Sequence, residues 1–106
     1  MSDPTAMHAV INHLSLQKTT DWAALSRAFE GFEAMLRTHH PGFRGCTLIR
    51  AGDDAGILVV SIDTREALDT ISKNAAAPWF AEHVRPLLAG AVSRSVGEVV
   101  AGSALR

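Results

Sequence analysis

The sequence predicts an α+β domain of the split βαβ, or ferredoxin-like, pattern, in which helices cover one face of an antiparallel sheet. Three observations support this fold class. Apolar strand-like segments and helical segments follow one another in the order β-α-β-β-α-(α)-β. The two middle strands are close enough to form a hairpin. The length of 106 residues, 47% of them hydrophobic, suits a single globular domain. We therefore expect a flexible tail over residues 1–6 and one domain over residues 7–106.

Composition excludes several classes of function. With 10 basic and 11 acidic residues the net charge is −1, which gives no electrostatic footprint for nucleic acid or an anionic membrane. A single cysteine, Cys46, allows no internal disulfide and no cysteine-based zinc site, as expected in a reducing compartment. The first residues lack the features of a secretory signal, and no apolar run approaches the roughly 20 residues of a membrane span. These features favour a cytoplasmic domain.

The first strand is predicted over residues 7–16, where apolar and polar residues alternate. Its even-numbered face carries Val10, Asn12, Leu14 and Leu16, and its odd-numbered face carries Met7, Ala9, Ile11 and His13.

A helix is predicted next, with Thr19 or Thr20 as its N-cap and Asp21 in its first turn. It should end near Thr38, because a Pro-Gly pair follows at residues 41–42. Its apolar stripe consists of Trp22, Leu25, Phe29, Phe32 and Leu36.

The second half of the chain predicts a hairpin, helical segments and a final strand. Strands are expected over residues 43–51 and 56–62, with turn residues between them. A helix capped by Asp63 should run to about Lys73, where Asn74 breaks it. A further short helix should begin at Pro78, be kinked or ended by Pro86, and lead into a last strand over residues 91–101.

The sheet should have no face exposed to water. The strand over residues 57–62 is apolar on both faces, and so is the first strand. A sheet with one solvated face should alternate instead. The chain has too few helices to cover both faces, so the sequence predicts a homodimer in which two sheets pack face to face.

These elements and their motifs resemble the antibiotic biosynthesis monooxygenase domain family over about residues 8–101. The resemblance rests on the strand Val10-Ile11-Asn12-His13-Leu14-Ser15-Leu16, on Pro41-Gly42-Phe43-Arg44-Gly45 leading into Leu48-Ile49-Arg50, and on the helix start Arg65-Glu66-Ala67-Leu68. It implies a dimeric α+β barrel whose pocket lies between helices and sheet in each subunit. It also implies activities known in the family, which include oxidation of anthrones or phenols to quinones by O₂ without metal or flavin, and haem degradation in one branch.

Asn12 is the first candidate catalytic residue. Its amide lies on an otherwise apolar strand face, where an unpaired polar group costs roughly 1–3 kcal/mol. It is expected either to donate to a substrate oxygen in the pocket or to bond a neighbouring backbone group. In the family, an asparagine of the first strand at the matching place lines the pocket.

His83 is the second candidate, because it shares a helix face with Trp79 and Phe80. Its imidazole is expected to act as the general base for a phenolic proton, or else to lie at the surface with Glu82 or water. The resemblance also makes it the possible axial ligand of haem.

The remaining expected binding residues are apolar or cationic. Trp79 and Phe80 are predicted to form an apolar wall for a flat aromatic ligand, or simply to pack the helix on the sheet. Leu14 lies on the same strand face as Asn12. Arg50, at the end of the second strand, would meet an anionic substrate group or solvent. No metal site is expected, because His39 and His40 have no further ligands at useful spacing.

The sequence departs from the family at two aromatic positions. Many relatives have tryptophan at the end of the third strand, where this chain has Ile62, and the haem-degrading branch has another near Ile71. The chain also contains no tyrosine. The sequence therefore favours a cofactor-independent monooxygenase of small electron-rich aromatics. A non-catalytic small-molecule-binding dimer is the alternative, and a haem-binding or haem-degrading protein is less favoured.

Overall fold

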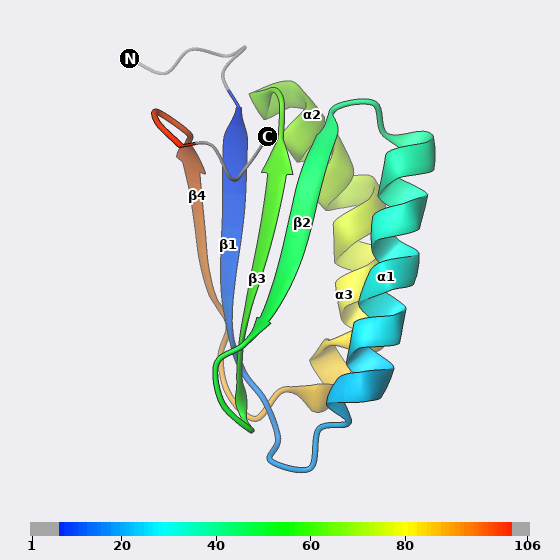
Figure 1. Cartoon of the computed structure of the whole chain (residues 1–106), viewed down its shortest axis with the longest axis vertical. Coiled ribbons are helices and arrows are strands. Elements are labelled where there is room, and N and C mark those ends of the chain that lie inside the picture. The colour runs from blue at the N-terminus through cyan, green and yellow to red at the C-terminus, as the bar shows by residue number, and fades with distance from the viewer. Residues whose placement is uncertain (1–6, 103–106) are drawn as a thin grey trace.

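The computed structural model describes residues 7–102, and the expected tail at residues 1–6 lies outside them. One four-stranded antiparallel sheet carries all of the helices on one face (Figure 1). The fold class predicted from the sequence is therefore confirmed. The elements in chain order are β1 (His8–Ser15), α1 (Trp22–His39), β2 (Phe43–Arg50), β3 (Ala55–Ile62), α2 (Arg65–Ile71), the π-helical turn η1 (Ser72–Ala76), α3 (Ala77–His83), the 3-10 turn η2 (Arg85–Leu87) and β4 (Ser93–Glu98).

The strand order is β2-β3-β1-β4, with β1 and β3 at the centre. Each of the three pairings is antiparallel. Opposite residues of paired strands project to the same face of a sheet. Asn12 of β1 is opposite Leu58 of β3 and Arg94 of β4, so these three side chains leave the sheet on the same face.

Helix α1 packs its predicted stripe against the sheet. Leu25, Phe29, Phe32 and Leu36 are all buried, as the helical spacing predicted. The N-cap is Asp21, whose carboxylate accepts from the Ala24 backbone N–H at 3.0 Å, and neither Thr19 nor Thr20 takes that place. An aspartate at the cap satisfies an orphan helical N–H and meets the positive end of the dipole.

The segment after β3 differs from the prediction in two ways. Thr64 caps α2 in place of Asp63, and its hydroxyl accepts from Ala67 N–H at 3.1 Å. Asn74 does not break the helix, since α2 continues through the π turn η1 directly into α3. The weak helix propensity of asparagine is outweighed where neighbours such as Ile71 and Ala75 are buried.

The last strand is shorter than residues 91–101. β4 spans Ser93–Glu98 and pairs with β1 from His13 to His8. Among the described residues, no helix is both long and apolar enough to cross a membrane.

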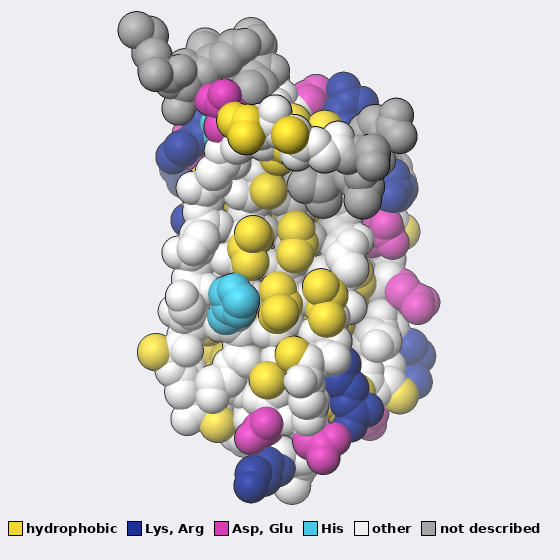
Figure 2. Space-filling model, turned by 60° about the vertical axis from the view of Figure 1, so that its left-hand side comes forward, with side chains coloured by type: hydrophobic (Ala, Val, Ile, Leu, Met, Phe, Trp, Pro, Cys, Tyr) yellow, Lys and Arg dark blue, Asp and Glu magenta, His cyan; other side chains and the backbone are white. Residues whose placement is uncertain are grey.

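The sheet face opposite the helices is apolar at its centre. Ile11 is opposite Val59, and Ile57 is opposite Ile49. Figure 2 shows apolar side chains gathered in the middle of this face with a histidine beside them. Ile49 is 42% exposed in the single chain. No helix of the described chain lies over this face (Figure 1).

Two glycines provide a test of the packing. A Cβ on Gly42 would lie 2.6 Å from Ala67 Cβ and 2.8 Å from Asp63 Oδ1, whereas a Cβ on Gly31 meets nothing within 4 Å. We expect Gly42→Ala to lower the free energy of unfolding by about 1–3 kcal/mol through overpacking. Gly31→Ala should raise it by about 0.5–1 kcal/mol, because alanine favours an exposed helix interior.

Urea denaturation at equal protein concentration measures both changes. A Gly42→Ala variant as stable as the parent protein would contradict the close packing of this turn against α2.

Candidate functional site

A cavity of about 620 Å³ lies between the helical layer and the sheet. Strands β1, β3 and β4 form one side of it, and residues from α1 and from the α2-η1-α3 segment form the other. Its interior is mainly apolar. The apolar side chains that line it include Val10, Leu58, Val60, Ile71, Trp79 and Phe80.

Asn12 lines this cavity among apolar neighbours. It is only partly buried, and within residues 7–102 its side chain makes no hydrogen bond. The backbone-bonded alternative for its amide is therefore not what the structure contains. The amide N–H₂ and carbonyl groups are free to bond a molecule in the cavity.

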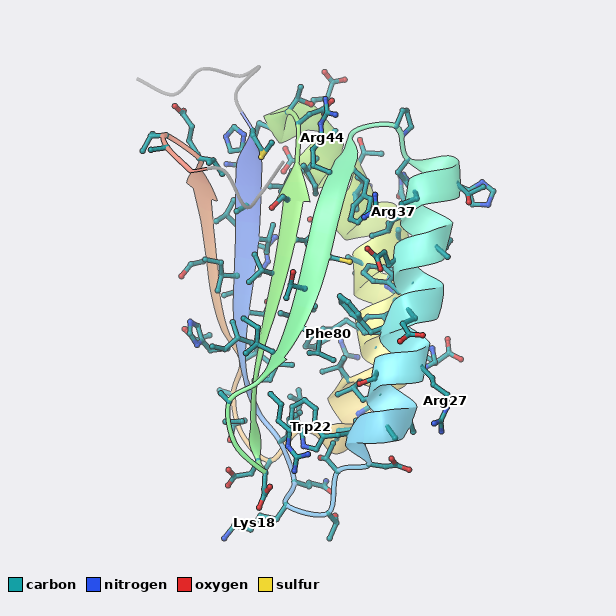
Figure 3. The ribbon with its side chains drawn as sticks, viewed as in Figure 1. Lys18, Trp22, Arg27, Arg37, Arg44 and Phe80 are labelled. Carbon is teal, nitrogen blue, oxygen red and sulfur yellow. The ribbon has the colours of Figure 1, made fainter. Side chains whose placement is uncertain are left out.

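Trp79 and Phe80 both line the cavity from α3. The Trp79 ring stacks on Phe32 with centroids 4.5 Å apart, and its Nε1 donates to the carbonyl oxygen of Ala28 at 3.3 Å. Phe80 points between α3 and the sheet (Figure 3). The sequence left helix packing and cavity lining as alternatives for Trp79, and in the structure Trp79 does both. Its packing on α1 fixes the position of this part of the cavity wall.

The other predicted site residues lie away from the cavity wall. His83 Nε2 is 3.7 Å from Glu82 Oε2, and its ring is 5.5 Å from the Trp79 ring. Its contact with Glu82 is the surface alternative that the sequence left open. The imidazole does not line the cavity.

Leu14 and Arg50 also do not line the cavity. Leu14 is buried in a separate apolar cluster with Leu16, Leu25 and Val84. Arg50 pairs with Asp53 at 2.7 Å and lies over the Trp22 ring at the hairpin end of the sheet. The places of Leu14 and Arg50 follow from their positions along the strands, because two residues can share a face of a sheet and still lie at different levels along its strands.

Three basic residues at the cavity were missed by the sequence reasoning. Lys73, Arg85 and Arg94 all line it, and they come from η1, η2 and β4. The sequence contained one signal that could have placed Arg94 at the cavity, because the correct register of the last strand puts Arg94 opposite Asn12. Lys73 and Arg85 had none, because the π turn that orients the helical segment is not visible in the periodicity.

The residues on the cavity wall do not fit haem ligated by His83. Within the described chain, the wall contains no histidine, cysteine or methionine to serve as the axial ligand. Ile62 and Ile71 both line the cavity. Residues 7–102 also contain no group of three or more metal-ligating side chains.

Cys46 lies beside this region as a half-buried thiol of the main core. Burial, and after it the charge of Glu33, raise the pKa of the Cys46 thiol to about 12, and the charge of Arg37 partly opposes this rise. The thiol is therefore protonated at neutral pH and behaves as a small apolar group, as expected from the sequence.

No protein-family model and no curated protein matches this sequence. Solved structures do match it. A proposed antibiotic biosynthesis monooxygenase from Caulobacter crescentus has a TM-score of 0.74 at 19% identity, covering 92% of this chain and 93% of that one. SnoaB, a cofactor-independent oxygenase from Streptomyces nogalater, has a TM-score of 0.72 at 16% identity, covering 92% and 96%.

This chain has the antibiotic biosynthesis monooxygenase fold. The resemblance drawn from the sequence is thereby confirmed at the level of fold. The same fold is found in a Nitrosomonas europaea protein of unknown function, with a TM-score of 0.71 at 14% identity over 95% of this chain and 96% of that one. At such identities the fold is shared, and the reaction has to be argued from the site.

The raised pKa of Cys46 predicts slow alkylation. Because the thiolate is the nucleophile, iodoacetamide at pH 8 should modify the folded protein far more slowly than the protein unfolded in urea. Mass spectrometry of quenched samples measures both rates. Equal rates in the two states would show that the thiol is accessible and ionised in the folded protein.

Proposed function

We propose that this protein is a cofactor-independent monooxygenase that oxidises a small electron-rich aromatic, an anthrone or a phenol, to a quinone with O₂. The observation that carries this proposal is the unbonded Asn12 amide in the wall of an apolar cavity. The fold that the chain shares with SnoaB, a cofactor-independent oxygenase, supports the same kind of reaction.

The reaction needs no electron donor besides the substrate. For an anthrone, the ring methylene becomes a carbonyl. One atom of O₂ enters that carbonyl, and the other leaves as water with the two methylene hydrogens. The substrate gives up four electrons and O₂ accepts four. The first step is loss of a proton from the substrate, which leaves a phenolate or enolate that reduces O₂.

Asn12 is assigned to that first step. Its amide N–H₂ donates to the substrate oxygen, where negative charge develops as the proton leaves. The surrounding apolar wall excludes water, which strengthens this hydrogen bond and protects the reactive anion. Trp79 and Phe80 provide a rigid surface for a flat ring, because packing on α1 holds the indole in place.

Proton removal was assigned to His83 from the sequence. In the structure, the imidazole contacts the Trp79 ring and does not contact the cavity. We therefore expect His83 to contribute less than Asn12, with solvent at the cavity mouth accepting much of the proton.

Oxygen consumption tests the proposal. Anthrones, naphthols and hydroquinones are supplied to the purified protein with a chelator and without flavin, metal or haem. We expect protein-dependent uptake that falls about 100-fold in kcat/KM in Asn12→Ala, the usual loss when one oxyanion donor is removed. His83→Ala should cause a smaller loss. Asn74→Ala removes the same side chain from an exposed position outside the cavity and should leave the rate unchanged.

Two outcomes contradict parts of this scheme. If oxygen uptake is no faster than the spontaneous reaction with every substrate, the result favours the alternative, a non-catalytic small-molecule-binding dimer. A loss in His83→Ala as large as that in Asn12→Ala would restore the imidazole as the base.

We further propose that two copies of the chain pair through the open face of the sheet. The central residues of this face, Ile11, Val59, Ile57 and Ile49, form an apolar surface that no helix of the described chain covers (Figure 2). A second copy presents the same surface, so a two-fold contact buries both at once.

Val59→Lys tests this pairing. A charge at the centre of the face should convert a dimer to a monomer, as measured by sedimentation equilibrium, because burying an unpaired ammonium is costly. Val100→Lys makes the same change at a residue that is 86% exposed and should leave the dimer intact. Circular dichroism confirms that each variant is folded. A dimer that persists in Val59→Lys would place the interface elsewhere.

A further inference from the structure

The basic side chains of the chain fall into two groups. Four arginines are paired with carboxylates, namely Arg37, Arg44, Arg50 and Arg65. Within residues 7–102, five basic side chains have no carboxylate partner, namely Lys18, Arg27, Lys73, Arg85 and Arg94. Three of these five line the cavity. Within residues 7–102, most of the unpaired basic side chains therefore lie at one site.

The three cations surround the cavity from separate elements. Lys73 belongs to η1, Arg85 to η2 and Arg94 to the edge strand β4, and all three are exposed. The interior is apolar, so the positive charge lies at the rim. Among residues 7–102, the one carboxylate on the wall is Asp69, which is already paired with Arg65 at 3.3 Å.

We propose that the molecule bound in this cavity is an aromatic acid, whose ring lies in the apolar interior and whose carboxylate is held at the rim by Arg94 and Arg85, with Lys73 adding charge. The proposal rests on the function proposed above in placing the substrate in this cavity. It narrows the substrate class from neutral anthrones and phenols to those that carry a carboxylate.

The position of Arg94 favours a carboxylate at a defined place. Arg94 is opposite Asn12 on adjacent strands, so their Cβ atoms are roughly 5 Å apart and their side chains leave the sheet on the same face. A guanidinium binds a carboxylate through two parallel hydrogen bonds. One end of the ligand is thereby fixed beside Asn12, and an oxygen on its ring falls within reach of the Asn12 amide.

Binding of a matched pair of probes tests the proposal. We would titrate 6-hydroxy-2-naphthoate and its neutral analogue 6-hydroxy-2-naphthamide, following naphthalene fluorescence. The naphthoate should bind roughly 10- to 100-fold more tightly than the amide, the range expected for charge-assisted hydrogen bonds. Raising NaCl from about 0.05 M to about 0.5 M should reduce this preference, because the rim is exposed to screening ions.

Variants assign the preference to the rim. Arg94→Gln and Arg85→Gln should each reduce the ratio of the two dissociation constants while leaving amide affinity within about twofold. Arg94→Lys keeps the charge and should retain part of the preference. Arg27→Gln is the control, since Arg27 is an unpaired arginine that points away from the sheet on the outer side of α1 (Figure 3).

Several results would overturn the proposal. These are equal affinity for the two probes, a preference unchanged in Arg94→Gln, and no binding of either probe at millimolar concentration. The result is also separable from the oxygenase proposal. A naphthoate preference without oxygen uptake by any substrate would leave an acid-binding protein that is not an oxygenase. Oxygen uptake with neutral anthrones, without a preference for the naphthoate, would support the oxygenase proposal and contradict the proposal that the rim binds an acid.

Discussion

The pairing of β1 with both β3 and β4 is the constraint on which the rest of this structure depends. It places a central strand between two partners and fixes which side chains share a face. Because opposite residues project together, the polar side chains of Asn12 and Arg94 lie side by side, next to the apolar Leu58 of β3. A register shift of one residue would move Asn12 to the opposite face of the sheet and remove it from the cavity.

The helical layer converts that polar pair into a site. α1 covers the sheet with its buried stripe, and Trp79 joins α3 to α1 by stacking on Phe32 and by its hydrogen bond to Ala28. The π turn η1 joins α2 to α3 without a break and contributes Ser72 and Lys73 to the cavity. Such turns are frequent at functional sites, because they re-aim side chains at a small cost in hydrogen-bond geometry.

The two faces of the sheet have different roles. The helix-covered face holds a cavity with a free amide and a basic rim, whereas the open face is apolar at its centre, with His13 opposite Ile57. Proteins with this fold include an oxygenase and one of unknown function, so the fold leaves the reaction open. The apolar side chains of the cavity are partly aliphatic, such as Ile62 and Ile71, and partly aromatic, such as Trp79 and Phe80.

The sequence by itself determined the element order, the buried stripe of α1 and the two-faced apolar sheet, and it offered a cavity position for Asn12, Trp79 and Phe80 as one of two alternatives each. These depend on local periodicity, which is written in consecutive residues. Only the tertiary structure decided the caps, the continuous α2-η1-α3 helix and the exclusion of His83, Leu14 and Arg50 from the cavity wall. It also gathered Lys73, Arg85 and Arg94 at one rim. Periodicity gives the face of an element but not the position along it, and strand pairing and helix packing set that position.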